Sequence, residues 1–225
     1  MKQLLSVFLS VFLLSTLGFS QNSCSKYYPF IEGKTFQITS YDKKGKKTSV
    51  VDYNITNVTD NTATFNTKIL DDKGKEITTN SYDITCKNDA ISIDFKSLIS
   101  PELLEQYKDM ELYISGTNIE LPNNLVVGQE LKDADMIMTI KMGGINMNMT
   151  MQLTDRKVDA MESVTTSAGT FDCYVISYTT EVKMGLKQTN MAKDWIAEGV
   201  GMVKSEAHNK NGKLLGYSEL TQISN

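Results

Sequence analysis

Arginine, histidine and proline are scarce in this chain of 225 residues. Arg156 is the only arginine, His208 is the only histidine, and there are three prolines. Lysine supplies the remaining positive charges, and the formal net charge is −4 at pH 7. Proteins that bind nucleic acids use a basic surface and the bidentate guanidinium of arginine. Because this chain is acidic and has only one arginine, nucleic acid is excluded as a partner.

The shortage of histidine also argues against the common catalytic sites. A serine or cysteine nucleophile needs a base, and the one imidazole lies beside an expected turn. Zinc ligands are not clustered, and motifs for phosphate or dinucleotide binding are missing. Carboxylate pairs leave no sequence trace, so acid–base chemistry at Asp133, Asp135 or Asp155 stays open. We expect a protein that is not an enzyme and has no cofactor.

Only three cysteines occur, Cys24, Cys86 and Cys173. An exported protein with three cysteines has at most one internal disulfide. Cys173 alternates with Phe171 and Val175, which is typical of a buried strand residue. We therefore favour a disulfide between Cys24 and Cys86, and three free thiols are the alternative.

The N-terminus contains the longest apolar stretch of the sequence. Lys2 is followed by an apolar core from Leu4 to Leu17, and Gly18 and Ser20 provide the small residues of a cleavage site. This arrangement is typical of a secretory signal peptide, and we predict one over residues 1–20. No later stretch reaches the roughly 18 apolar residues that a transmembrane helix needs.

Residues 21–225 are expected to form a single secreted, β-rich domain, and two smaller domains are the alternative. Its location would be the periplasm, the outer surface or the extracellular medium. Cys24 lies close behind the predicted signal, where lipid-modified cysteines occur. A lipid anchor is nevertheless not expected, because Gln-Asn-Ser precedes Cys24 in place of the leucine and small residues of lipidation sites.

From Thr35 onward the composition is that of a β protein. Thr, Val, Ile, Tyr and Phe fill short segments bounded by Gly, Asn, Asp and Lys. Polar turns with glycine at the fourth place predict three hairpins, at Asp42–Lys46, Asp71–Lys75 and Asn209–Lys213. Strands are predicted at residues 35–41, 49–59, 62–70, 76–86, 90–95, 134–142, 145–154, 158–166, 171–182, 190–196, 199–208 and 214–223.

One helix is expected to interrupt the strands, over Ser100–Met110. Ser100 is a favourable N-cap residue and Pro101 suits the first helical position. The helix would place one apolar face on the sheet, formed by Leu103, Leu104, Tyr107 and Met110. The expected fold is mainly β: a single strongly curved antiparallel sheet or unclosed β barrel with one short packed helix.

Methionine is concentrated in one stretch, "MIMTIKMGGINMNMTMQL", from Met136 to Leu153. Gly143-Gly144 predicts a two-residue hairpin turn. Alternation along the two strands then places eight side chains on one side of the sheet, Met136, Met138, Ile140, Met142, Ile145, Met147, Met149 and Met151. We call these eight residues the methionine face. Burial of each such side chain contributes about 1.5–3 kcal/mol, so something must cover this face.

Three covers are possible for the methionine face. The first is the protein's own helix and loops, which would make it ordinary core. The second is an apolar ligand or a partner's apolar segment, because the flexible thioethers adapt to varied shapes. The third is Cu(I), which opposed pairs such as Met138 and Met149 could bind.

The function that we predict is an exported, non-enzymatic binding protein that holds an apolar, lipid-like ligand on the methionine face. The alternative is an envelope structural or assembly protein that binds another protein through its sheet surface.

Several short segments are similar to a known family. They are "YDKKGK" at Tyr41–Lys46, "GQELKDA" at Gly128–Ala134, Gly169-Thr170-Phe171 before Cys173, Trp195, and "EGVGMVKSE" at Glu198–Glu206. In these segments the chain resembles the TapB-like family of secreted bacterial proteins of unknown function, which is related to a larger domain family of unknown function. The resemblance implies an exported β protein and provides no catalytic residues. The expected fold also resembles half-open β barrels that carry lipids or lipoproteins across the periplasm.

Overall fold

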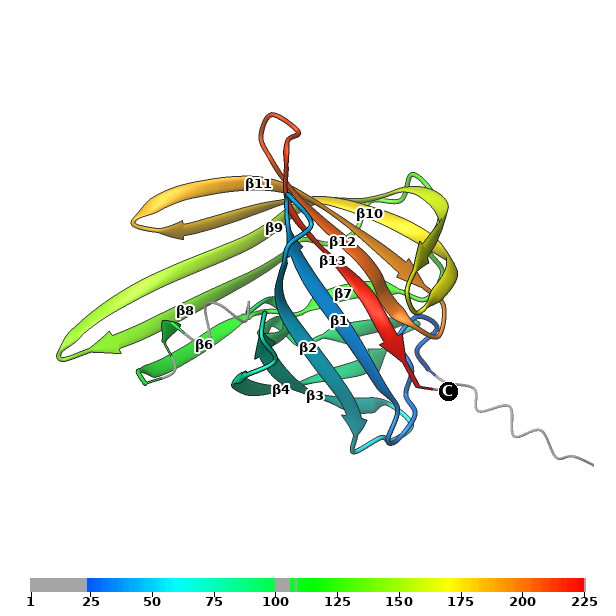
Figure 1. Ribbon diagram of the computed structural model, residues 1–225, viewed down its shortest axis with the longest axis horizontal. Helices are drawn as coiled ribbons and strands as arrows, with labels where there is room; N and C mark the ends of the chain where they lie inside the picture. The colour runs from blue at the N-terminus through cyan, green and yellow to red at the C-terminus, as the bar shows by residue number, and fades with distance from the viewer. Residues whose placement is uncertain (1–23, 100–105, 108, 225) are drawn as a thin grey trace, which may run out of the picture.

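The computed structural model describes residues 24–99, 106–107 and 109–224. Thirteen strands form one sheet in the order β6-β8-β9-β10-β11-β12-β13-β1-β2-β3-β4-β5-β7. Every strand pair is antiparallel. The sheet curls into a barrel that its two edge strands do not seal, which confirms the predicted fold class (Figure 1).

The strands are β1 (Thr35–Asp42), β2 (Lys47–Thr56), β3 (Thr62–Asp71), β4 (Glu76–Lys87), β5 (Ala90–Ile93), β6 (Glu111–Thr117), β7 (Ile119–Pro122), β8 (Ala134–Met142), β9 (Ile145–Thr166), β10 (Gly169–Met184), β11 (Leu186–Ala197), β12 (Gly201–Asn209) and β13 (Leu214–Ile223). A 3-10 helix, η1 (Phe95–Leu98), follows β5. The long hairpins β8–β9 and β10–β11 project beyond the barrel on the left of Figure 1.

The three predicted polar hairpin turns are confirmed, and they share one hydrogen-bonding scheme. The side-chain oxygen of the first residue accepts the backbone N–H groups two and four residues further on. The glycine at the fourth place has a φ of 76–84°, which side chains disfavour. Local sequence chemistry therefore determines these turns.

The structure contains two short strands, β6 and β7, that were not predicted. The two strands predicted at residues 145–154 and 158–166 are parts of one continuous strand. β6 and β7 are the edges of the sheet, and most side chains of β6 are exposed, so its apolar alternation is weak. Residues 145–166 form the single long strand β9, because Asp155 adopts a φ of 55° and bends the strand without ending it. The helix predicted at Ser100–Met110 falls mainly outside the described residues.

The N-terminal segment closes one end of the barrel. Tyr27 is fully buried in the main core, and Gly33 donates a backbone hydrogen bond to Ile55 at the end of β2. The favoured cysteine pair is joined in the structure: Cys24 forms a disulfide with Cys86, near the end of β4. Cys173 is a buried free thiol.

Asn118 joins the two edges of the sheet, because it is the one residue between β6 and β7. Its Nδ2 donates to Ser92 Oγ at 3.1 Å, and its Oδ1 accepts the backbone N–H of Phe95 at 3.2 Å. The loop after β7 then lies against β9, where Leu131 donates its N–H to the carbonyl of Arg156 at 2.8 Å. The barrel is thus bridged at its seam by a loop and by side chains.

Candidate functional site

The methionine hairpin has the predicted register. Met136 pairs with Met151, Met138 with Met149, Ile140 with Met147 and Met142 with Ile145. Met136, Met138, Ile140 and Met149 are at most 2% exposed. They form a second hydrophobic cluster, separate from the barrel core, together with Ile99 and Tyr107. The protein's own residues therefore cover this part of the methionine face.

The other members of the methionine face differ in their surroundings. Met147 and Met151 are half-buried at the margin of the same cluster. Ile145 is 69% exposed at the hairpin turn. The side chain of Met142 lies outside the described part of the structure. The eight residues lie on one side of the sheet, but only some of them are buried in the second hydrophobic cluster.

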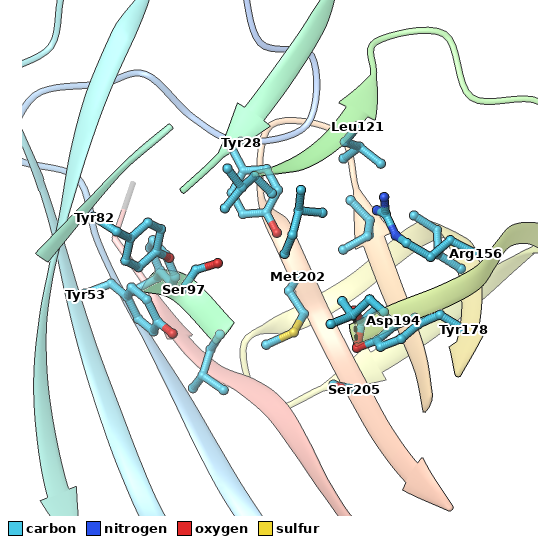
Figure 2. A pocket seen from close by; sticks show the side chains of 17 residues that line it. Tyr28, Tyr53, Tyr82, Ser97, Leu121, Arg156, Tyr178, Asp194, Met202 and Ser205 are labelled. Atoms are coloured by element: carbon cyan, nitrogen blue, oxygen red, sulfur yellow. Dashed lines mark hydrogen bonds between the residues drawn. The ribbon is translucent and has the colours of Figure 1, made fainter. Parts of the chain in front are cut away.

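A different site lies inside the barrel. A cavity of about 220 Å³ is lined by residues of β1, β2, β4, β5, η1, β7, β9, β10, β11 and β12 and of the N-terminal segment. Its apolar wall includes Phe36, Ile38, Ile93, Leu121, Leu153, Ile176, Ile196 and Met202. Figure 2 shows tyrosines, one arginine and one aspartate among these apolar side chains. The combination suits a small molecule with apolar and polar parts.

Arg156 is the only buried cation in the described part of the chain, with 5% exposure. Its Nη1 donates to the backbone carbonyls of Glu120, at 3.2 Å, and of Lys132. These bonds connect β9 to the opposite edge of the barrel and hold the guanidinium at the cavity wall (Figure 2). Burial lowers the pKa of Arg156, and arginine nevertheless keeps its charge in proteins.

Asp194 lies on β11 in the same cavity. Its Oδ2 accepts a hydrogen bond from the Tyr178 hydroxyl at 3.0 Å. Its Oδ1 is buried and has no hydrogen-bond partner among the residues that the structure describes. Burial raises the pKa of the Asp194 carboxyl, and the neighbouring hydroxyls of Ser205 and Tyr178 and the charge of Arg156 offset part of that rise. The cavity therefore contains a carboxyl group with an unused acceptor.

Three further tyrosine side chains line the cavity. They belong to Tyr28, on the N-terminal segment, to Tyr53 on β2 and to Tyr82 on β4 (Figure 2). Burial raises the pKa of Tyr53 to about 12 and that of Tyr82 well above its usual value, so both stay neutral. Within the described residues no protein group hydrogen-bonds to the three hydroxyls. All three are free to contact a bound molecule.

The sequence predictions did not include the cavity residues. Arg156, Tyr178 and Asp194 lie on three strands, and only strand pairing brings them together. The one signal in the sequence that could have pointed to the cavity was Arg156, a lone arginine in a strand that otherwise alternates apolar and polar residues.

No described group of three or more His, Cys, Asp or Glu residues could hold a metal ion. No helix in the described part of the chain is long and apolar enough to cross a membrane.

Comparison with known proteins agrees on the fold. An exported protein with a YmcC-like fold from Bacteroides fragilis has 22% identity and a TM-score of 0.77, over 90% of this chain and 100% of that one. A protein from Parabacteroides distasonis, assigned as a lipoprotein, has 23% identity and a TM-score of 0.75, over 89% and 99% of the two chains. At these identities the likeness shows the fold alone. No curated protein matches the sequence.

The sequence also matches a family model described as DUF3108-like, over residues 31–220. That range begins just before β1 and ends within β13, so it contains nearly the whole sheet. Proteins of this kind have no known function, and no enzymatic activity is indicated by the match. The chain therefore belongs to the DUF3108-like family.

Proposed function

We propose that the protein is an exported binding protein that holds a small amphipathic, lipid-like ligand inside the barrel. The observation that carries this proposal is the interior cavity of about 220 Å³, which combines an apolar wall with Asp194 Oδ1, a buried acceptor that has no hydrogen-bond partner among the described residues. Unpartnered polar groups are costly in a buried site, and a ligand with matching groups removes that cost.

The size of the cavity limits the ligand. Typical pockets for drug-sized molecules have volumes of roughly 300–1,000 Å³. A volume of about 220 Å³ suits a smaller molecule, or one chain of a larger molecule whose remainder lies outside the barrel. Ordered water would occupy the same space in the absence of a ligand.

The methionine face is the second place for an apolar ligand, as the sequence predicts. The methionine face is less well suited to a ligand than the cavity, because neighbouring residues of the protein already bury Met136, Met138, Ile140 and Met149. Export, and membership of the TapB-like branch within the family, are parts of the same proposal. Export is supported by the description of the Bacteroides fragilis protein.

Native mass spectrometry of the protein purified from its own host tests this proposal. The measurement is repeated after denaturation, and the released molecules are extracted and identified. The matched variants are Met202→Trp, which fills the cavity, and Met161→Trp on β9, whose side chain is 56% exposed. Circular dichroism checks that both variants fold.

The wild type and Met161→Trp are expected to carry an additional mass that denaturation removes. Met202→Trp is expected to have the mass of the bare chain. A bare wild-type chain contradicts the proposal, as does a ligand that both variants retain equally. A bare chain would favour the second candidate, an envelope assembly protein, which the self-packed methionine cluster also supports.

A further inference from the structure

We propose that the cavity ligand carries a single negative charge, namely a carboxylate head on an aliphatic chain, and that Arg156 binds this carboxylate. This inference rests on the proposed function, because it names the chemical class of the molecule that occupies the cavity.

The backbone of β9 turns Arg156 toward the inside of the barrel. Asp155 has a φ of 55°, and the register between β9 and β10 shifts between Ser177 and Thr179. This bulge changes the face to which the next side chain points. A charged residue is thereby placed in the wall of an apolar cavity, where solvent exposure is 5%.

The charge of Arg156 has no ion-pair partner within 4.0 Å among the described residues, and the carboxylates of Asp194, Asp133 and Glu120 act on it only from a longer range. Glu120 and Lys132 accept hydrogen bonds from the guanidinium through their backbone carbonyls, whereas their side chains pair with each other at 2.6 Å. Asp194 lies in the same cavity and is bonded to Tyr178. A buried charge without a partner is costly, and an anionic ligand would provide that partner.

The geometry favours a carboxylate over other anions. Two backbone carbonyls engage only Nη1, so the rest of the planar guanidinium remains available for a bidentate bond to a planar carboxylate. One cation neutralises one negative charge, so a doubly charged phosphate head would remain half uncompensated. The aliphatic chain would lie against Leu121, Leu153 and Ile176.

Asp194 couples the binding of an anion to pH. A ligand carboxylate repels an ionised Asp194, so binding is stronger when Asp194 is protonated. The other titratable groups at the cavity are Arg156, which stays charged, and Tyr28, Tyr53, Tyr82 and Tyr178, which stay neutral. Affinity for the anion is therefore expected to rise as pH falls, and Asp194→Asn should weaken that dependence.

The test compares ligand heads on one protein, so it does not depend on a variant that folds poorly. Isothermal titration calorimetry is performed on the full exported chain, stripped of bound molecules, with decanoate, methyl decanoate, 1-decanol and decyl phosphate. Decanoate is expected to bind about 10-fold to 100-fold more tightly than the ester and the alcohol, the usual range for hydrogen bonds to a charged group. Decyl phosphate is expected to bind more weakly than decanoate.

Protein variants provide the second arm. Arg156→Met is expected to remove the preference for decanoate over its ester, and Arg156→Lys to retain part of it. Lys157→Met is the matched control, because Lys157 is exposed on the same strand and lies outside the cavity. If Arg156→Met does not fold, the comparison of the four ligands on the wild type still tests whether the cavity prefers a carboxylate.

The outcomes separate the two proposals. Equal affinity for decanoate and methyl decanoate overturns the inference about Arg156 and leaves the proposed function intact. Tighter binding of decyl phosphate overturns the assignment of the head as a carboxylate. Absence of binding to all four compounds, together with a bare native mass, overturns the proposed function itself.

Discussion

Four serine side chains lie side by side across the barrel wall, next to the cavity. The register pairs Ser205 with Ser218, Ser218 with Ser40 and Ser40 with Ser49, and Asp194 pairs with Ser205. Ser40 Oγ and Ser218 Oγ are hydrogen-bonded at 2.9 Å. Both ends of the row hold a buried oxygen without a partner among the described residues, Ser49 Oγ and Asp194 Oδ1. The effect of each of these two oxygens on the free energy of unfolding can be measured with single substitutions.

Ser49→Ala and Ser40→Ala form a matched pair of substitutions. Ser49→Ala removes a buried hydroxyl without a partner and should leave the free energy of unfolding unchanged or raise it by up to about 1–3 kcal/mol. Ser40→Ala removes a hydrogen bond and should lower that free energy by about 0.5–1.5 kcal/mol. Urea denaturation measures both. An equal loss in the two variants would mean that Ser49 has an acceptor, for example an ordered water.

Asp194 should make stability depend on pH. Because burial raises its pKa in the folded protein, the unfolded chain loses this proton at a lower pH than the folded one. Its contribution to stability is therefore greatest below the pKa of the unfolded chain, about 3.9, and decreases as pH rises through the folded pKa. The free energy of unfolding of Asp194→Asn, relative to wild type, should increase over that interval.

Urea denaturation at a series of pH values measures this difference. Asp172→Asn, at an exposed position of β10, is the control for the loss of an aspartate. A constant difference between Asp194→Asn and wild type at all pH values would show that Asp194 ionises in the folded protein as it does in the unfolded chain.

At the scale of elements, the hairpin β8–β9 has a core of its own. Met136, Met138, Ile140 and Met149 pack with Ile99 and Tyr107 away from the barrel core. The Tyr107 hydroxyl donates to the sulfur of Met184 on β10 at 3.5 Å, so β10 contributes to the same cluster. This part of the sheet is therefore able to lose its structure separately from the barrel.

The double substitution Met138→Gln with Met149→Gln tests that separation. Each buries an amide without a partner, so together they should lower the local stability of the hairpin by at least about 3 kcal/mol. Hydrogen exchange should accelerate in β6, β8 and the first half of β9, and remain slow in β1 and β13. Met161→Gln is the control, since its side chain is 56% exposed. Unchanged exchange in β8 would show that the methionine face is an open trough that water already reaches.

For the whole molecule, the disulfide between Cys24 and Cys86 links the N-terminal segment to the sheet across 62 positions of sequence. The segment lies over one end of the barrel and places Tyr27 in the core and Tyr28 in the cavity wall. Cross-linking a loop of this length stabilises a fold mainly by restricting the unfolded chain. The disulfide also occupies the Cys24 sulfur, which is the atom that a lipid anchor would require.

Cys24→Ser with Cys86→Ser should lower the free energy of unfolding by about 2–5 kcal/mol. A reductant should lower the free energy of unfolding of the wild type by a similar amount, which is measured as a lower Tm. The same reductant should leave the Tm of the double variant unchanged. The intact mass of the wild type purified from its own host should correspond to a chain with one disulfide and no attached lipid. A lipid-sized increase in mass, with a free thiol at Cys86, would contradict this pairing.

Local chemistry allowed much of the fold to be predicted. The polar turns with glycine at the fourth place, the Gly143-Gly144 hairpin and its register follow from φ preferences and from the alternation of side chains along a strand. The single antiparallel sheet followed from the many short β segments and the hairpin turns between them. The buried position of Cys173 followed from alternation in the same way.

What lies against each face was decided only by the tertiary structure. The sequence determined that the methionine face had to be covered, whereas its cover comes from Ile99, Tyr107 and Met184, which are distant along the chain. The cavity likewise brings together Tyr28, Arg156 and Asp194 through closure of the barrel. Turn geometry and strand alternation are set by neighbouring residues, and therefore appear in the sequence. The pairing of distant strands depends on the total burial and hydrogen bonding of the whole sheet, which no short segment contains.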